Sequence, residues 1–234
     1  ASGNHLIEAT VHGLCEVIER DAYALWQYRT AADRADRRVD PATMSDPGVR
    51  HLLDRLDDAG LLVAVWEITT DIGVPAFRAT ILTLQDDPLR PLYPSSGLGC
   101  HPCRDVAVFR ALSEAVQSRL TRISSSRDDD DRRDYELTRN PDRLQDMRTR
   151  LITQPAVRPL SAAPTRVTDD VADDLDWVVD RLVTAGHDQA LVVDLSRPEI
   201  GIPVVRTIVP GLEPKPGSDG YRPGPRVRSL VESS

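Results

Sequence analysis

Lysine is almost missing from this sequence: Lys215 is the only one among 29 lysine and arginine residues. A phosphate-binding loop of the G-x-x-x-x-G-K-[ST] type and the ATP-contacting lysine of a protein kinase are therefore excluded. An enzyme that forms a Schiff base would have to use Lys215, which lies in the turn-like stretch "EPKPGSDG". The H-E-x-x-H, G-x-S-x-G and G-x-G-x-x-G patterns are also absent. Most common nucleotide-binding and hydrolase signatures are thus ruled out.

Long apolar runs, basic net charge and disulfide-type cysteine spacing are missing too. The longest apolar run, Leu61 to Trp66, is strand-sized and well short of the roughly 20 residues of a membrane span. A net charge of −8 argues against broad binding to nucleic acid or to an anionic membrane. Three cysteines without a scaffold pattern, and no visible signal peptide, predict a reducing, cytoplasmic setting.

The remaining pattern predicts helices interspersed with strands. Periodicity and capping signals predict helices at residues 4–30, with Asn4 as cap, and at 49–59, 105–123, 141–151 and 169–185. Strands are predicted at 61–69 and 75–84, joined as a hairpin, and at 189–195 and 202–209. We expect a linker at 33–48, a glycine-containing loop at 95–102 and an extended, proline-rich tail after Pro210. This order predicts an α/β or α+β fold in which long helices cover a mixed sheet.

The first predicted helix collects acidic side chains on one face. At about 100° per residue, Glu8, Glu16 and Glu19 fall within an arc of about 80°, with Asn4 and Arg20 at its two edges. The apolar side chains lie on the other side of the helix, at Ile7, Leu14, Ile18 and Leu25. One interpretation is a solvated face on which Glu16 and Arg20 form an i,i+4 ion pair.

A second predicted helix repeats the pattern and favours another interpretation. In "RALSEAVQSRL", Glu114 and Gln117 lie three residues apart and share a face, with Arg119 two residues further on. Carboxylates gathered from two helices repel one another unless a cation lies between them, and hard oxygen ligands suit Mg²⁺. Because Mg²⁺ in enzymes usually has a phosphate partner, these carboxylates would hold metal ions that in turn hold a polyphosphate.

Three blocks of the sequence resemble one protein family. "ASGNHLIEATVHGLCEVIERDA", with the spacing N-x3-E-x7-E-x2-E-R, resembles the nucleotide-binding helix of the YcaO family. "GLGCHPCRDVAVFRALSEAVQSRLTRISSSRDD" resembles its second signature, including E-x-x-Q at Glu114 and Gln117, and "IPVVRTIVPGLE" resembles its closing strand. The blocks occur in the family's order. The chain therefore resembles the C-terminal portion of a YcaO protein, with a YcaO-like catalytic domain at 1–213 and an extended tail at 214–234.

The resemblance implies ATP and Mg²⁺ as cofactors. It implies that phosphate is transferred to a backbone amide oxygen of a peptide after a nucleophile has attacked that carbonyl. Carried over by position, the metal ligands would be Glu8, Glu16, Glu19 and Glu114. The nucleotide-binding residues would be Asn4, Glu8, Arg20, Gln117, Arg119 and Arg127. No single residue is assigned as catalytic.

The resemblance leaves the product open. In the family, a Cys, Ser or Thr side chain as nucleophile yields an azoline, and a sulfur donor yields a thioamide. Azoline-forming members often end in P-x-P-x-P, of which this chain keeps only Pro223-x-Pro225. The expected partners are a peptide substrate with a leader and a leader-binding or sulfur-handling protein, and a homodimer is also open. Because family members have an upstream portion that adds nucleotide-binding residues, we expect this chain to hold part of the ATP site.

Other functions stay open from the residues alone. The chain could be a non-catalytic module that binds a leader peptide or a partner, or an unrelated two-metal hydrolase built on acidic helices. A zinc or redox site at Cys100-x-x-Cys103 lacks a second cysteine pair, and a di-iron bundle lacks E-x-x-H. The run "RDDDDRRD" is interpreted as a solvated loop or as a flap over the nucleotide.

Overall fold

A four-stranded antiparallel sheet forms the centre of the protein. The structure is a computed structural model and describes residues 1–85, 94–124, 141–217 and 220–232. The sheet has the order β1-β2-β3-β4, with strands Arg38–Val39, Leu61–Glu67, Ala76–Thr83 and Ser95–Cys100. Strands β2 and β3 form the predicted hairpin, in which Val65 lies opposite Ala79. The predicted α+β class is confirmed.

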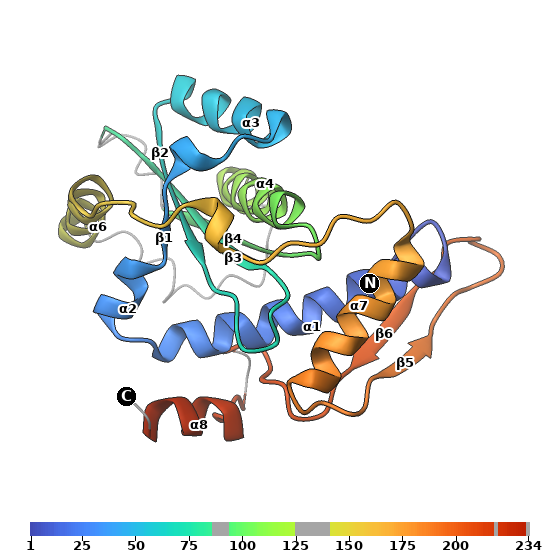
Figure 1. Ribbon diagram of the computed structural model, residues 1–234. Helices are drawn as coiled ribbons and strands as arrows, with labels where there is room; N and C mark the ends of the chain where they lie inside the picture. Colours follow the sequence, from blue (N-terminus) through green and yellow to red (C-terminus); the bar gives the residue numbers. More distant parts are fainter. Residues whose placement is uncertain (86–93, 125–140, 218–219, 233–234) are drawn as a thin grey trace.

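Alternate residues of the sheet face two different cores. Ala64 and Trp66 pack with α1 (Leu6–Tyr28), α6 (Pro141–Thr153) and α7 (Val171–Thr184). Val65 and Phe77 pack with α3 (Pro47–Asp58) and α4 (Arg104–Ile123). This alternation is the two-residue period of a strand that is buried on both faces. The sheet therefore separates α1 from α3 and α4 (Figure 1).

Strand β4 occupies the segment 95–102 that was predicted as a loop, so that prediction is wrong. Serine and glycine are poor strand formers, which is why the segment has a weak strand signal. The glycines serve close packing instead. A Cβ atom on Gly97 would lie 2.3 Å from the carbonyl oxygen of Ala111, and one on Gly99 would lie 2.1 Å from that of Ala107. Helix α4 can lie directly on β4 because both positions lack a side chain.

The first helix begins two residues later than predicted and has a different cap. α1 starts at Leu6, and the Nδ1 atom of His5 accepts a hydrogen bond from the backbone N–H of Glu8 at 3.3 Å. Asn4 is therefore not the cap, because its backbone and side-chain N–H groups donate to the Glu8 carboxylate at 2.8 and 2.9 Å. Leu14, Ile18 and Leu25 are buried as expected, whereas Ile7 is 40% exposed and does not belong to the core.

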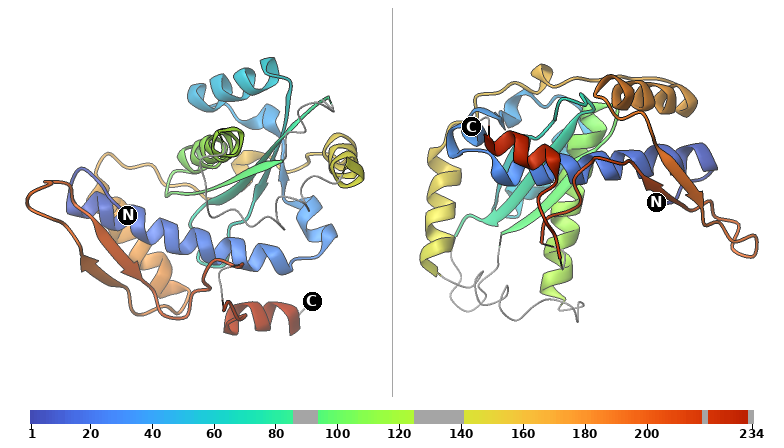
Figure 2. Two further views of the ribbon diagram at one scale, coloured as in Figure 1. Left: turned by 180° about the vertical axis from the view of Figure 1, so that it is seen from behind. Right: turned by 90° about the horizontal axis from the view of Figure 1, so that it is seen from below.

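The other element predictions hold, except those for the segment 33–48 and for the tail after Pro210. The predicted helices at 49–59, 105–123, 141–151 and 169–185 are confirmed as α3, α4, α6 and α7. The segment 33–48 is not a plain linker, because it contains the end of α2 (Ala31–Asp36), strand β1 and the 3-10 turn Pro41–Thr43. Elsewhere in the chain, a second 3-10 turn spans Leu160–Ala162. The last two predicted strands pair as β5 (Leu191–Asp194) and β6 (Val205–Ile208), beside the N-terminal half of α1 (Figure 2). None of the helices in the described residues is long and apolar enough to span a membrane.

The tail after Pro210 ends in a helix, so the prediction of a wholly extended tail is wrong. α8 (Pro225–Glu232) begins with Pro225, a residue that the first turn of a helix tolerates. The carboxylate of Glu213 accepts hydrogen bonds from the backbone N–H groups of Gly224 at 2.8 Å and Val227 at 3.2 Å. It thereby satisfies donors at the start of α8 that would otherwise be unpaired. This cap comes from a residue distant in sequence, which local pattern could not show.

Replacing Gly99 by alanine tests the close packing of α4 on β4. We expect Gly99→Ala to lower the free energy of unfolding by about 2–4 kcal/mol, because backbone atoms rather than a flexible side chain oppose the added Cβ. The matched change Gly48→Ala in the first turn of α3 meets only side-chain atoms, of Asp46 at 3.2 Å and of Phe109 at 3.8 Å, and should alter stability by less than about 1 kcal/mol. Urea unfolding of both variants measures the difference. Equal stability of the two variants would contradict this packing.

Candidate functional site

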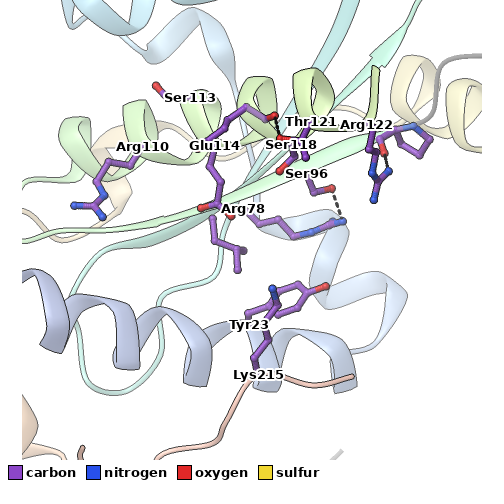
Figure 3. Close-up of a pocket in the computed structure, with 13 residues that line it drawn as sticks. Tyr23, Arg78, Ser96, Arg110, Ser113, Glu114, Ser118, Thr121, Arg122 and Lys215 are labelled. Atoms are coloured by element: carbon purple, nitrogen blue, oxygen red, sulfur yellow. Dashed lines mark hydrogen bonds between the residues drawn. The ribbon is translucent and has the colours of Figure 1, made fainter. Parts of the chain in front are cut away.

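Two adjoining cavities lie between α1, β4 and α4. The smaller has a volume of about 310 Å³ and the larger of about 760 Å³. Four residues line both of them: Leu98, Arg110, Glu114 and Lys215. The smaller cavity adds residues of α1 only, namely His12, Glu16, Glu19 and Arg20. The larger cavity adds, among others, Tyr23 of α1, Arg78 of β3 and Ser96 of β4 (Figure 3). Gln117 of α4 also lines it. The smaller one is named the acidic cavity below.

The acidic cavity brings together three of the carboxylates that the sequence singled out. Glu16 and Glu19 lie three residues apart on α1 and so share one face, and Glu114 reaches the cavity from α4. Burial, the neighbouring charge of Glu114 and, less strongly, that of Glu16 raise the pKa of Glu19 to about 7. Burial also raises the pKa of Glu114, although Lys215 and Arg110 act in the opposite direction. The cavity therefore brings together carboxylates that disfavour one another's charge, and a cation placed among them would relieve this repulsion.

The chemistry of these side chains fits Mg²⁺ with a shared coordination shell. In the described part of the chain, no three His, Cys, Asp or Glu side chains converge closely enough to hold a metal ion by themselves. Mg²⁺ usually binds one or two carboxylates and completes its six-oxygen shell with phosphate oxygens and water. A cavity of about 310 Å³ that is lined by carboxylates from α1 and from α4 has room for a Mg²⁺ ion that arrives with a phosphate ligand.

Basic side chains also surround the acidic cavity. Arg20 pairs with Glu16, as the i,i+4 spacing predicts, and both side chains stay well exposed, at 49% and 38%. Arg110 of α4 forms a contact of 2.7 Å between its Nη2 atom and the Nε2 atom of His12 on α1. It also acts to lower the pKa of Glu19. Cationic groups therefore stand close enough to contact an anionic ligand of a metal ion bound by Glu19.

The C-terminal segment places Lys215 at both cavities. Lys215 follows Glu213, whose backbone N–H donates to the buried carboxylate of Asp21 on α1 at 3.0 Å. Arg226 of α8 donates to the same Asp21 oxygen at 2.9 Å and to Asp71 at 2.5 Å. These contacts hold the segment against α1. Sequence reasoning placed the only lysine in a turn and missed this position, because a contact across about 200 residues leaves no local signal.

Several predicted site residues lie elsewhere. Asn4 and Glu8 bond to each other at the start of α1 and line neither cavity. Gln117 lines the larger cavity, whereas Arg119 lines neither, since it projects from another side of α4. Arg127, with the run "RDDDDRRD", lies outside the described residues. The proposed roles of Asn4, Glu8, Arg119 and Arg127 stay predictions.

The cysteine alternative gains no support from the structure. Cys100 is fully buried in the core together with Cys15, while Cys103 is partly exposed at the start of α4. Burial raises the pKa of the Cys100 thiol and so disfavours the thiolate that zinc requires. Within the described ranges no group of metal-binding side chains includes the pair.

Comparison with known proteins connects this geometry to a family. Residues 1–213 match the model of the family described as "YcaO cyclodehydratase", ATP- and Mg²⁺-binding. An uncharacterised protein encoded in the tfuA 3′ region of Rhizobium leguminosarum bv. trifolii is 39% identical over 91% of this chain and 51% of its own length. The chain spans about half the length of the curated relatives it matches.

Solved structures share the fold. A heterocyclase described in complex with substrate and cofactor superposes with a TM-score of 0.71 at 28% identity, over 92% of this chain and 28% of that protein. YcaO from Methanopyrus kandleri, described as bound with AMPPCP and Mg²⁺, has a TM-score of 0.71 at 21% identity, over 91% of this chain and 54% of that protein. The second likeness is one of fold alone.

The raised pKa of Glu19 predicts how stability depends on pH without a bound metal. Its folded-state pKa of about 7 exceeds the ordinary value of 4.5, so between these values the folded protein keeps a proton that the unfolded chain loses. Stability should therefore fall as the pH rises through this interval. We expect Glu19→Gln to raise the free energy of unfolding by about 2 kcal/mol at pH 8 and to have little effect below pH 4.5.

Urea unfolding in EDTA at both pH values checks this expectation. The exposed carboxylate of Asp176 on α7 provides the matched control, and Asp176→Asn should show no comparable pH-dependent gain. A Glu19→Gln variant that is less stable than wild type at pH 8 would show that the carboxylates do not repel one another as described.

Proposed function

Because this chain belongs to the YcaO family, we propose that it carries the metal- and phosphate-binding part of an enzyme that activates backbone amides of a peptide with ATP and Mg²⁺. The family description as an ATP- and Mg²⁺-binding cyclodehydratase supports the cofactors and the reaction class. The heterocyclase that is 28% identical is described with substrate and cofactor, which supports a small-molecule cofactor near the matched fold. The acidic cavity between α1 and α4 is the observation that carries the proposal for this chain.

Glu16, Glu19 and Glu114 would hold the metal. Bound there, Mg²⁺ would neutralise their mutual repulsion and bind phosphate oxygens of ATP. The pKa of Glu19 near 7 means that this residue gives up its proton readily once a cation is present. Glu8, which the family pattern adds to this set, lies outside the cavity and would take part only through a rearrangement at the start of α1.

The basic residues at the cavity would orient the triphosphate. The ion pair between Arg20 and Glu16 is exposed, and exposed pairs contribute only about 0–1 kcal/mol, so Arg20 is able to exchange its carboxylate for a phosphate. A guanidinium can bind two phosphate oxygens at once, which suits Arg20 and Arg110 to this role. Gln117 would contact the nucleotide from α4, since its side chain lines the adjoining cavity.

The peptide, its leader and a partner protein belong to the proposal as well. Amide activation is the step shared by both products of the family, and the nucleophile that attacks the carbonyl decides between azoline and thioamide. A partner would be sought among neighbouring genes, as the Rhizobium relative is itself encoded beside tfuA. Pro225 is the first residue of α8, so Pro223-x-Pro225 leads into a helix and not into a longer extended proline-rich segment.

Calorimetric titration of the full-length protein with ATP saturated with Mg²⁺ tests the proposal. Glu16→Gln and Glu19→Gln should each weaken binding by about tenfold or more, equivalent to about 1.4 kcal/mol, because each removes a charged ligand. Asp176→Asn removes an exposed carboxylate of α7 that lines neither cavity, so this variant should bind Mg²⁺–ATP like wild type. Each variant is compared at equal folded fraction, measured by circular dichroism.

Two outcomes would contradict the proposal. Wild-type protein that takes up no Mg²⁺–ATP would favour the alternative, a module that binds a peptide or partner without nucleotide. Binding that is unchanged in both glutamate variants would place the nucleotide elsewhere in the protein.

A further inference from the structure

The larger cavity carries an excess of positive charge, whereas the three carboxylates of the acidic cavity are balanced by Arg20, Arg110 and Lys215. Four cationic side chains line it, namely Arg78, Arg110, Arg122 and Lys215. Among the lining residues that the structure describes, Glu114 is the only carboxylate. The chain as a whole has a net charge of −8, so this excess of positive charge is local and does not reflect composition. A cavity of this kind attracts anions.

Arg78 is held inside this cavity by neutral partners. Its Nη2 atom donates to the hydroxyl oxygen of Ser96 at 3.1 Å, and its guanidinium lies 5.6 Å from the ring centroid of Trp66. Figure 3 shows the side chain between Ser96 of β4 and Tyr23 of α1. Trp66 in turn contacts Trp26, with 6.2 Å between the ring centroids. Aromatic faces and a hydroxyl fix the plane of the guanidinium without neutralising its charge.

Three other partly or largely buried arginines have stronger partners. Arg226 pairs with Asp21 and Asp71, Arg158 pairs with Glu67, and Arg38 donates to two backbone carbonyl oxygens at 2.5 and 2.7 Å. Arg78 pairs with no carboxylate among the described residues, and its buried Nε–H has no hydrogen-bond partner.

Burial lowers the pKa of Arg78, as expected for a desolvated cation that lacks a counter-ion. A buried charge without a partner is unfavourable, and a bound anion would relieve it.

We propose that the larger cavity binds an oxyanion, a phosphate or a carboxylate, through the guanidinium of Arg78, and that this binding needs no metal ion. Planar guanidinium groups match both kinds of oxyanion, because two of their N–H donors can contact two oxygen atoms. The anion is either a phosphate group of the nucleotide or of its products, or a carboxylate of the peptide substrate. Where the anion is a phosphate of the nucleotide, this inference deepens the proposed function, which places Gln117 of the same cavity near the nucleotide. Its observations do not involve the metal of the acidic cavity.

Titration of the full-length protein in EDTA with inorganic pyrophosphate and, separately, with glutarate tests the inference and distinguishes the two sources. Arg78→Gln should weaken binding of the preferred anion about tenfold or more, and Arg78→Lys should weaken it less, because the charge stays while the two-pronged contact is lost. The titration contains no metal ion, so it does not depend on Glu16 and Glu19 as metal ligands. Failure of Mg²⁺–ATP to bind would therefore leave the inference standing. Equally, absence of metal-free anion binding would leave the proposed Mg²⁺–ATP site standing.

Arg34 provides a closely matched control. It lies 5.4 Å from the ring centroid of Trp26, it also has a buried Nε–H without a partner, and it does not line the cavity. Arg34→Gln removes the same charge from the same aromatic pair and should change anion affinity by no more than about twofold. If Arg78→Gln fails to fold, Ser96→Ala replaces it. Loss of the hydroxyl that orients Arg78 should weaken anion binding about threefold.

Each outcome either supports or overturns anion binding by Arg78. Pyrophosphate binding that depends on Arg78 supports the inference and assigns the site to a phosphate group. Glutarate binding that depends on Arg78 supports it and assigns the site to a substrate carboxylate. Absence of metal-free binding of either anion, or binding that Arg78→Gln and Arg34→Gln reduce equally, would overturn it and leave Arg78 as a packing partner of Trp66.

Discussion

Repulsion among carboxylates on two crossing helices is the constraint on which the site depends. Glu16 and Glu19 on α1 and Glu114 on α4 line one small cavity, and the pKa of Glu19 rises to about 7 because burial and the neighbouring carboxylates both disfavour its charge. A protein gains nothing in stability from such an arrangement. A bound cation removes the conflict, and a cation with open coordination positions recruits phosphate. Under the proposed function, ATP binding without a phosphate loop would follow from that one electrostatic conflict.

The packing of the sheet makes this convergence possible. Gly97 and Gly99 allow α4 to lie directly on β4, and α1 packs across the opposite face of the same sheet through Leu14 and Ile18. Both helices extend past the edge strand, so side chains from each reach the space beside Leu98. The C-terminal segment closes this region from outside, because the salt bridge from Arg226 to Asp21 and Asp71 holds it on α1 and brings Lys215 to the cavities. The acidic cavity holds Glu16, Glu19 and Glu114, and the larger cavity has an excess of basic side chains.

Much of the fold and half of the site could be predicted from sequence. Periodicity located α3, α4, α6, α7 and the β2–β3 hairpin, because these elements bury one regular stripe or face. The spacing of Glu16, Glu19 and Glu114 indicated their shared role, since helical geometry alone aligns each group. Strand β4 was missed because its glycines serve helix packing, and α8 was missed because its cap, Glu213, is distant in sequence. Arg110 lies four residues before Glu114 on α4 and shares its face, a local signal that the sequence analysis did not use. Arg78 and Lys215 reach the cavities through tertiary contacts that have no local pattern.

Proton release on nucleotide binding tests the central claim most directly. If a cation bound with ATP occupies the acidic cavity, Glu19 must lose the proton that its raised pKa lets it keep in the free protein. Calorimetry at pH 7 in two buffers of different ionisation enthalpy, with ATP already saturated with Mg²⁺, counts these protons. The full-length wild type should release about half a proton per nucleotide bound, and Glu19→Gln should release none. Binding without proton release in wild type, or equal release in both proteins, would contradict the account.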